Sequence, residues 1–192
     1  ERRIFVVNEY DLYLYTKDYT TGYEGTWEEP IGLPDEAFEE GTCIAFQYAP
    51  ASDRTGYLYL LRGGGGSTFN FFRRAIEVPS GGPRSPQRQF DWERLPDFQD
   101  GIVAGGAMCY NNYLGQPGLY VFRGEGDNRL YYYSINSRTW QQVRTPTPER
   151  QNPGSDLTWA YGVWQNTGLF CIFGERSTNY WFYNTPHEIW LP

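Results

Sequence analysis

The stretch from residue 118 to residue 140 decides the fold. It reads Gly118-Leu-Tyr-Val-Phe-Arg-Gly-Glu-Gly-Asp-Asn128, continues as Leu130-Tyr-Tyr-Tyr133 and closes on Trp140. Short runs rich in aromatic and β-branched residues, bounded by Gly, Asp and Asn, are typical of antiparallel strands joined by tight turns. The apolar residues do not follow the 3.6-residue spacing of a helix. The stretch therefore predicts three consecutive β-strands, the last of which carries Trp140.

Three further copies of this pattern surround the first. Each has a first strand, a second strand rich in aromatic residues, and a tryptophan, and in all but the weaker copy at the start of the chain the first strand ends near glycine. The copies span residues 4–27, 56–92 and 168–190, and the four tryptophans are Trp27, Trp92, Trp140 and Trp190. A repeat of this length predicts units that cannot bury both faces alone and therefore stack on their neighbours.

Each unit is expected to contain four strands. In the clearest copy, an innermost strand is predicted within 101–110, because Ala104, Gly105, Gly106 and Ala107 are small enough for neighbouring units to approach there. Strands at 119–122, 130–133 and 139–143 follow it. The fold class is therefore all-β: a β-propeller of about four four-stranded antiparallel blades, with approximate boundaries 1–34, 35–96, 97–146 and 147–192 in one domain, 1–192.

The repeat resembles the kelch motif, in which a glycine doublet ends the second strand and a tyrosine and a tryptophan follow at set spacings. The doublet is present as Gly63-Gly64 and becomes Gly124-Glu125 and Gly174-Glu175 in the later copies. The resemblance implies a kelch-like propeller, a scaffold that is used most often to recognise proteins or carbohydrates and occasionally for catalysis.

The number of strands leaves two architectures open. The first unit has no recognisable innermost strand, so fifteen strands can be assigned where four complete blades need sixteen. The chain is either a four-bladed ring that closes in an irregular way, or part of a larger propeller. We favour the second, in which an oligomer or a partner chain completes the propeller, because an unpaired edge strand attracts other strands.

Charge and hydropathy exclude several partners. A net charge of −7 and a pI near 4.8 disfavour nucleic acid and anionic lipid, which are bound by clustered Lys and Arg. No apolar run approaches the ~18 residues that a membrane-spanning helix needs, so membrane insertion is not expected. The single Lys and many Tyr slightly favour a secreted or cell-surface protein.

The cysteines and the histidine do not form a recognisable disulfide, metal or catalytic pattern. Cys43, Cys109 and Cys171 are an odd number of widely spaced residues in apolar runs, which predicts buried free thiols rather than disulfides or a zinc site. One histidine, His187, cannot build a multi-histidine metal centre, and its place beside Pro186 predicts an exposed turn. No catalytic residues, no metal and no cofactor are predicted, and the chain is not expected to be an enzyme.

The candidate ligand-binding residues lie in the turns between second and third strands. In an up-and-down blade these turns share one loop face with the connections between blades, which carry Asp97, Asp100 and Glu149. The candidates, whose side chains offer planar donors and acceptors, are Arg62, Arg123, Glu125, Asp127, Glu175 and Arg176.

The sequence predicts a noncatalytic, lectin-like binding module that recognises a protein or glycan through this loop face. Three alternatives stay open. The same Arg and Glu residues could form only exposed ion pairs between blades. Glu125 and Glu175 could act as the paired carboxylates of a carbohydrate-active enzyme domain. The chain could also be a structural subunit that completes a larger assembly.

Overall fold

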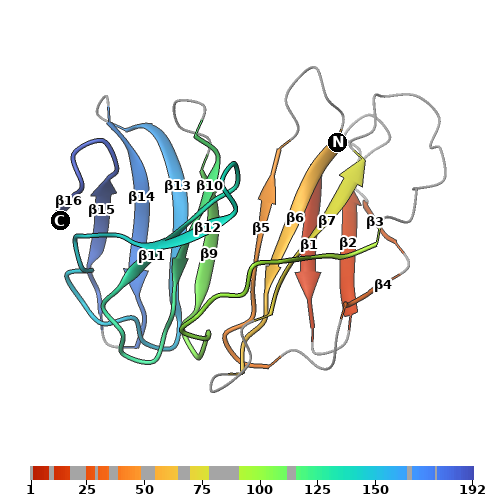
Figure 1. Cartoon of the computed structure of the whole chain (residues 1–192), viewed down its shortest axis with the longest axis horizontal. Coiled ribbons are helices and arrows are strands. Elements are labelled where there is room, and N and C mark those ends of the chain that lie inside the picture. The colour runs from red at the N-terminus through yellow and green to blue at the C-terminus, as the bar shows by residue number, and fades with distance from the viewer. Residues whose placement is uncertain are drawn as a thin grey trace. The chain divides into compact units, whose positions relative to one another are not determined.

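The computed structural model describes residues 2–8, 11–17, 25–28, 30–34, 39–48, 55–64, 70–77, 91–111, 116–163, 166–175 and 177–192 (Figure 1). The described residues form strands and turns and contain no helix. No helix that could cross a membrane occurs in this part of the chain. The chain divides into two compact units, residues 1–39 and 40–192.

The first unit contains one sheet, the first sheet. It consists of β1 (Arg2–Val7), β2 (Asp11–Lys17), β3 (Gly25–Trp27) and β4 (Ile31–Gly32). β3 pairs with the second half of β2 and β4 with its beginning, so β3 and β4 are two parts of one row beside β2. The described part of this sheet is therefore three rows wide, which agrees with the missing innermost strand in the sequence.

The second unit contains three four-stranded antiparallel sheets. The second sheet comprises β5 (Cys43–Gln47), β6 (Thr55–Leu61), β7 (Phe71–Glu77) and β8 (Glu93–Leu95). The third comprises β9 (Ala107–Asn111), β10 (Gly118–Phe122), β11 (Leu130–Ser134) and β12 (Thr139–Gln142), and the fourth β13 (Ser155–Val163), β14 (Asn166–Phe173), β15 (Tyr180–Asn184) and β16 (Ile189–Leu191). The all-β class and the four four-stranded antiparallel sheets are confirmed.

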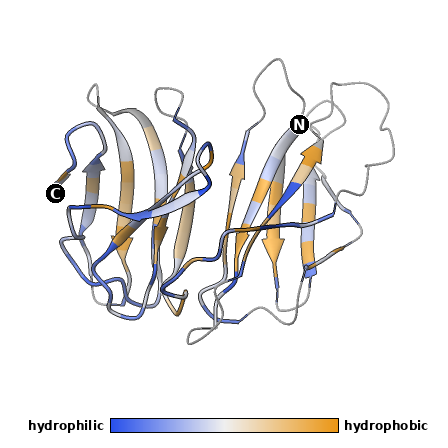
Figure 2. Cartoon of the chain, in the orientation of Figure 1, coloured by the Kyte–Doolittle hydropathy of each residue, from blue (hydrophilic) through white to orange (hydrophobic). Residues whose placement is uncertain are grey.

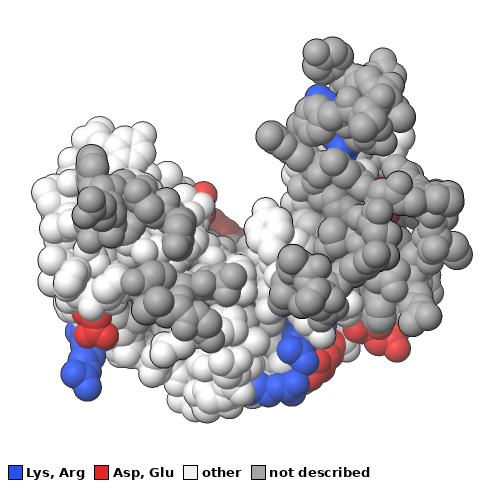
Figure 3. All heavy atoms as spheres, turned by 90° about the horizontal axis from the view of Figure 1, so that it is seen from above, with Lys and Arg blue, Asp and Glu red and all other residues white. Residues whose placement is uncertain are grey.

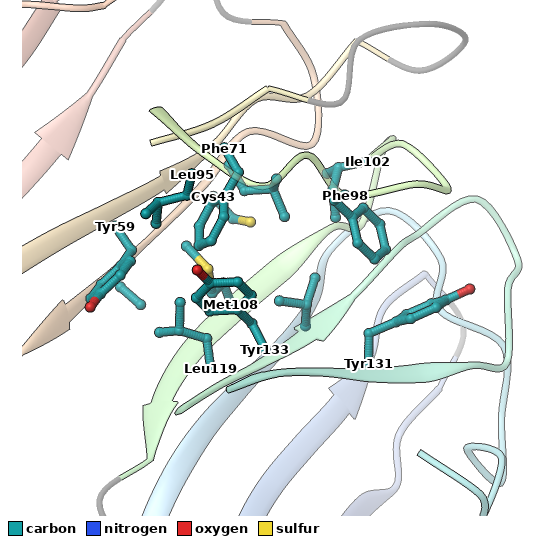
Figure 4. Packing of buried hydrophobic residues seen from close by; sticks show 13 residues of the cluster. Cys43, Tyr59, Phe71, Leu95, Phe98, Ile102, Met108, Leu119, Tyr131 and Tyr133 are labelled. Atoms are coloured by element: carbon teal, nitrogen blue, oxygen red, sulfur yellow. The ribbon is translucent and has the colours of Figure 1, made fainter. Parts of the chain in front are cut away.

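The three sheets of the second unit stack through their first strands. β9 contacts β5 on one side and β13 on the other. One buried cluster joins the second and third sheets, where Phe71 of β7 meets Tyr133 of β11 with ring centroids 4.9 Å apart (Figure 4). A second cluster joins the third and fourth sheets, where Phe122 and Phe173 stack at 5.4 Å. The core therefore lies between the sheets, as stacked repeats require.

The strand registers repeat from sheet to sheet. Trp140 pairs with Tyr133 and Trp190 with Tyr183, and Trp27 pairs with Tyr15 in the first sheet. Figure 2 shows hydrophobic positions along the strands, whereas the described turns and connections are mainly blue or white. Several aromatic side chains, among them Phe71, Tyr133 and Tyr183, are buried in the core, and Trp140 and Trp190 pack against it while partly exposed.

The prediction of a strand over residues 101–110 is partly wrong. β9 begins only at Ala107, and Ala104, Gly105 and Gly106 form a turn before it. Gly105 has a φ of 85°, and a Cβ there would collide with the carbonyl group of Asn152. The small residues do allow close approach between neighbouring repeats, but they do so in the turn that leads into the innermost strand.

The three thiols are free and buried, as predicted. Burial raises the pKa of the Cys43, Cys109 and Cys171 thiols, because the thiolate would lose its hydration. These cysteines therefore act as small apolar side chains within the stacked sheets.

Candidate functional site

The predicted loop face is organised by one hydrogen bond that recurs in all three sheets of the second unit. The backbone N–H groups of Gly64, Glu125 and Glu175 donate to carbonyls of the segments before the innermost strands, namely those of Glu40, Ala104 and Pro153, at 3.0, 2.8 and 3.1 Å. We call this surface the turn face and define it as residues 39–42, 62–64, 97–106, 123–129, 144–154, 174–175 and 177–179. The recurring bond fixes each turn against the segment that enters its own sheet.

Glu125 and Glu175 hold the same unusual place in successive turns. Their φ angles are 52° and 46°, in the left-handed region that costs a residue with a Cβ about 1–2 kcal/mol. Both side chains are exposed, and within the described residues neither carboxylate accepts a hydrogen bond. Two strained backbone positions therefore present two unengaged carboxylates to solvent.

Asp127 is held inside its turn rather than offered to solvent. Its side chain is only 6% exposed and accepts hydrogen bonds from Arg129, the shortest of them 2.6 Å from Nη2. Arg123 Nη1 lies 3.5 Å from the same carboxylate, and Arg123 Nε donates to the carbonyl of Asp100 at 2.8 Å. Although burial alone would raise its pKa, the hydrogen bonds from Arg129 hold the pKa of Asp127 below its ordinary value of 3.8.

A second carboxylate, that of Asp100, joins the contacts around Asp127 to Tyr131. Asp100 Oδ2 accepts a hydrogen bond from the Tyr131 hydroxyl at 2.6 Å and lies 3.5 Å from Arg129 Nη1. Burial, followed by the hydrogen bond to Asp100, raises the pKa of Tyr131, so the phenol stays protonated as a donor. We call Asp100, Arg123, Asp127, Arg129 and Tyr131 the Asp127 cluster; its contacts stabilise the turn.

Gln151 joins the turn of the third sheet to the connection that leads into the fourth. This residue is fully buried; its Oε1 accepts from the Gly124 N–H at 3.1 Å and its Nε2 donates to the Arg129 carbonyl at 2.7 Å. Its backbone also pairs with that of Asp127. Sequence reasoning missed Gln151 because the other repeats offer no matching residue.

Glu149 is another engaged acid on the turn face. Its Oε1 accepts hydrogen bonds from Asn179 Nδ2 at 2.9 Å and from Trp181 Nε1 at 2.7 Å. These donors lower the pKa of Glu149, because they stabilise the ionised form. Glu149 thereby ties the connection between the third and fourth sheets to β15.

The structure describes five of the six predicted site residues, and they differ in exposure. Glu125 and Glu175 are exposed, whereas Arg62, directly after β6, is only 8% exposed. Arg123 and Asp127 belong to the Asp127 cluster. Arg176 lies outside the described residues.

Figure 3 shows the chain from above, and most of the described surface visible in this view is uncharged. One ion pair of the second unit, between Arg138 Nη1 and Glu93 Oε1 at 2.9 Å, connects the turn after β11 with β8.

The arrangement suits ligand contact better than acid–base catalysis. A glycosidase general acid sits in apolar surroundings, whereas Glu125 and Glu175 are both open to solvent. Within the residues that the structure describes, no three His, Cys, Asp or Glu side chains come close enough together to hold a metal ion.

Comparisons of the chain with protein-family models, with curated proteins and with solved structures find no match.

Proposed function

We propose that the chain is a noncatalytic binding module built on a kelch-like β-propeller, with its four sheets as blades, and that it recognises a protein or glycan through the turn face. The observation that carries the proposal is the matched pair Glu125 and Glu175. Both hold a left-handed backbone conformation that glycine adopts without strain, and both direct an unengaged carboxylate into solvent. Arg138 and Glu188 hold the same backbone conformation at another pair of equivalent turns, so the strain by itself assigns no role to a side chain. What supports a binding role for Glu125 and Glu175 is that both lie on the turn face with exposed carboxylates that no described residue engages.

The chemistry of the pair defines what it can bind. Carboxylates accept hydrogen bonds, strongly from cationic groups and also from hydroxyl groups. A ligand would therefore present Lys or Arg side chains, or the hydroxyl groups of a glycan. The Asp127 cluster and Gln151 support recognition indirectly, by holding the turn that carries Glu125 in one conformation.

The recurring turn also supports a binding role for the whole face. Because the backbone bonds of Gly64, Glu125 and Glu175 fix the three turns, a ligand that spans adjacent turns would meet preorganised groups. Preorganisation of this kind raises affinity without requiring a deep cavity.

The experiment that tests the proposal begins with a ligand search. The wild-type chain and the Glu125→Gln/Glu175→Gln double variant are compared on a glycan array and in affinity capture with identified proteins. We expect the wild type to retain ligands that the double variant loses, because glutamine keeps the size of glutamate but not its charge. A ligand set that is unchanged in the double variant would contradict the proposal, and turnover of a captured glycoside would replace it with an enzymatic function.

A further inference from the structure

Two sheets of this protein each leave an apolar face uncovered. On the fourth sheet, Ile172 and Tyr180 pair across β14 and β15, and Tyr180 is 73% exposed. Phe170 and Phe182 pair on the same face, with ring centroids 5.1 Å apart, but Phe182 is buried, so the open part of this face is formed by Ile172 and Tyr180. On the first sheet, the exposed apolar side chains are Ile4, Val6 and Trp27. Large exposed apolar side chains clustered on one sheet face mark an interaction surface.

The uncovered face of the fourth sheet corresponds, position by position, to an interface within the chain. Phe122 and Leu130 pair in the third sheet as Ile172 and Tyr180 pair in the fourth, fifty residues later. Phe122 and Leu130 are fully buried, because their face packs against the fourth sheet. The exposed face of the fourth sheet therefore corresponds to the face of the third sheet that packs against the fourth sheet.

The uncovered face of the first sheet corresponds to the other side of the same kind of interface. Tyr15 pairs with Ile4 and Trp27, as Tyr133 pairs with Leu119 and Trp140 in the third sheet. In the third sheet, this face packs against the second sheet and buries Leu119 and Tyr133. The exposed face of the first sheet therefore corresponds to the face of the third sheet that packs against the second sheet.

We propose that the Ile172–Tyr180 face of the fourth sheet binds the Ile4–Trp27 face of the first sheet of a second copy of this chain. Both surfaces of this interface are present on the chain. The chain already forms an interface of the same type twice, once between its second and third sheets and once between its third and fourth sheets. The contact is head-to-tail, because it joins two different surfaces. This association is independent of the turn face, so it goes beyond the proposed ligand recognition.

Sedimentation velocity over a range of concentrations tests the proposal. We expect the wild type to associate, and Tyr180→Arg or Val6→Arg to be monomeric, because each variant places a charge in the apolar contact. Tyr48→Arg is the matched control, since Tyr48 is also a largely exposed tyrosine but lies at the end of β5, on another sheet. It should associate as the wild type does. Circular dichroism and thermal melting establish that all variants remain folded.

Mixing the two monomeric variants tests whether the contact between copies is head-to-tail, that is, between the fourth sheet of one copy and the first sheet of another. Tyr180→Arg retains an intact first-sheet face and Val6→Arg an intact fourth-sheet face, so an equimolar mixture should form a heterodimer. A mixture that stays monomeric while the wild type associates would overturn the head-to-tail contact. A wild type that is monomeric at every concentration would overturn the proposal that a second copy binds this face, whether or not another partner does.

Discussion

Tyr183 and Trp190 lie opposite each other across β15 and β16, with ring centroids 4.8 Å apart. Tyr133 and Trp140 have the same relationship in the third sheet, at 4.9 Å. In the second sheet a cation replaces the tyrosine ring: the Arg74 guanidinium lies 5.9 Å from the centre of the Trp92 ring. Each short outermost strand is thus fastened to its neighbour through its tryptophan, which explains why this residue marks every copy of the repeat.

Trp140→Ala should lower the free energy of unfolding by about 3 kcal/mol, near the lower end of the range for loss of a core aromatic. Trp140 packs against Phe71, Phe98 and Tyr133, and its Nε1 donates to the Pro96 carbonyl at 2.9 Å. Urea unfolding of the dilute chain measures the loss. Trp27→Ala is the control and should cost much less, because Trp27 is 58% exposed. Equal losses in the two variants would contradict the packing role of Trp140.

Gln151→Ala should destabilise the protein by about 1–3 kcal/mol, because it leaves the Gly124 N–H and the Arg129 carbonyl without their side-chain partner. Hydrogen exchange, followed by mass spectrometry, should show faster exchange at residues 123–129 and 150–152 and little change in β5–β7. A uniform increase over the whole second unit would instead indicate that Gln151 serves global stability and not the turn.

The repeat and its four-stranded antiparallel units could be predicted from sequence because they depend on local patterns of glycine-bounded strands and on the four tryptophans. The register, which pairs Tyr133 with Trp140 and Tyr15 with Trp27, becomes visible only in the structure. The innermost strand was placed too early, because a run of small residues is compatible with either a strand or a close-packed turn. Only the approach of Gly105 to the Asn152 backbone distinguishes the two.

The candidate site was predictable only in part. Sequence spacing placed Glu125 and Glu175 in equivalent turns, but the left-handed backbone that they share becomes visible only in the structure. The sequence predicts Asp127 as a ligand contact but does not show that Arg129, two residues later, engages its carboxylate. Gln151 escaped notice because its partners lie more than twenty residues away along the chain.

Acid should destabilise the protein through Asp127 and Glu149. Their pKa values are lower in the folded chain than the ordinary 3.8 and 4.5, so the unfolded chain binds more protons as the pH falls through this range. Their contributions to the free energy of unfolding are therefore complete above about pH 5 and are lost progressively below about pH 4. The urea midpoint should fall between pH 5 and pH 3, and less steeply in Asp127→Asn. An Asp127→Asn profile parallel to that of the wild type would contradict this assignment.

Glu125→Gly should preserve or increase stability, by up to about 1 kcal/mol, while weakening ligand binding. Glycine relieves the left-handed strain at φ 52°, although it also adds freedom to the unfolded chain. Glu188→Gly is the matched control, because Glu188 has a φ of 53° in the turn between β15 and β16 and is not one of the turn-face residues; its contact with them, from Thr145 Oγ1 at 2.7 Å, is to its backbone carbonyl, which the substitution keeps. It should have a similar effect on stability and leave binding unchanged. A clear loss of stability in Glu125→Gly would show that the glutamate side chain is structural.

The most direct test of the central claim is the affinity of a captured ligand, measured by isothermal titration calorimetry for three proteins: the wild type, Glu125→Gln/Glu175→Gln and Glu188→Gln. We predict that the double variant binds at least about tenfold more weakly, which corresponds to about 1.4 kcal/mol, and that Glu188→Gln binds as the wild type does. Equal affinities in the wild type and the double variant would contradict recognition through the turn face.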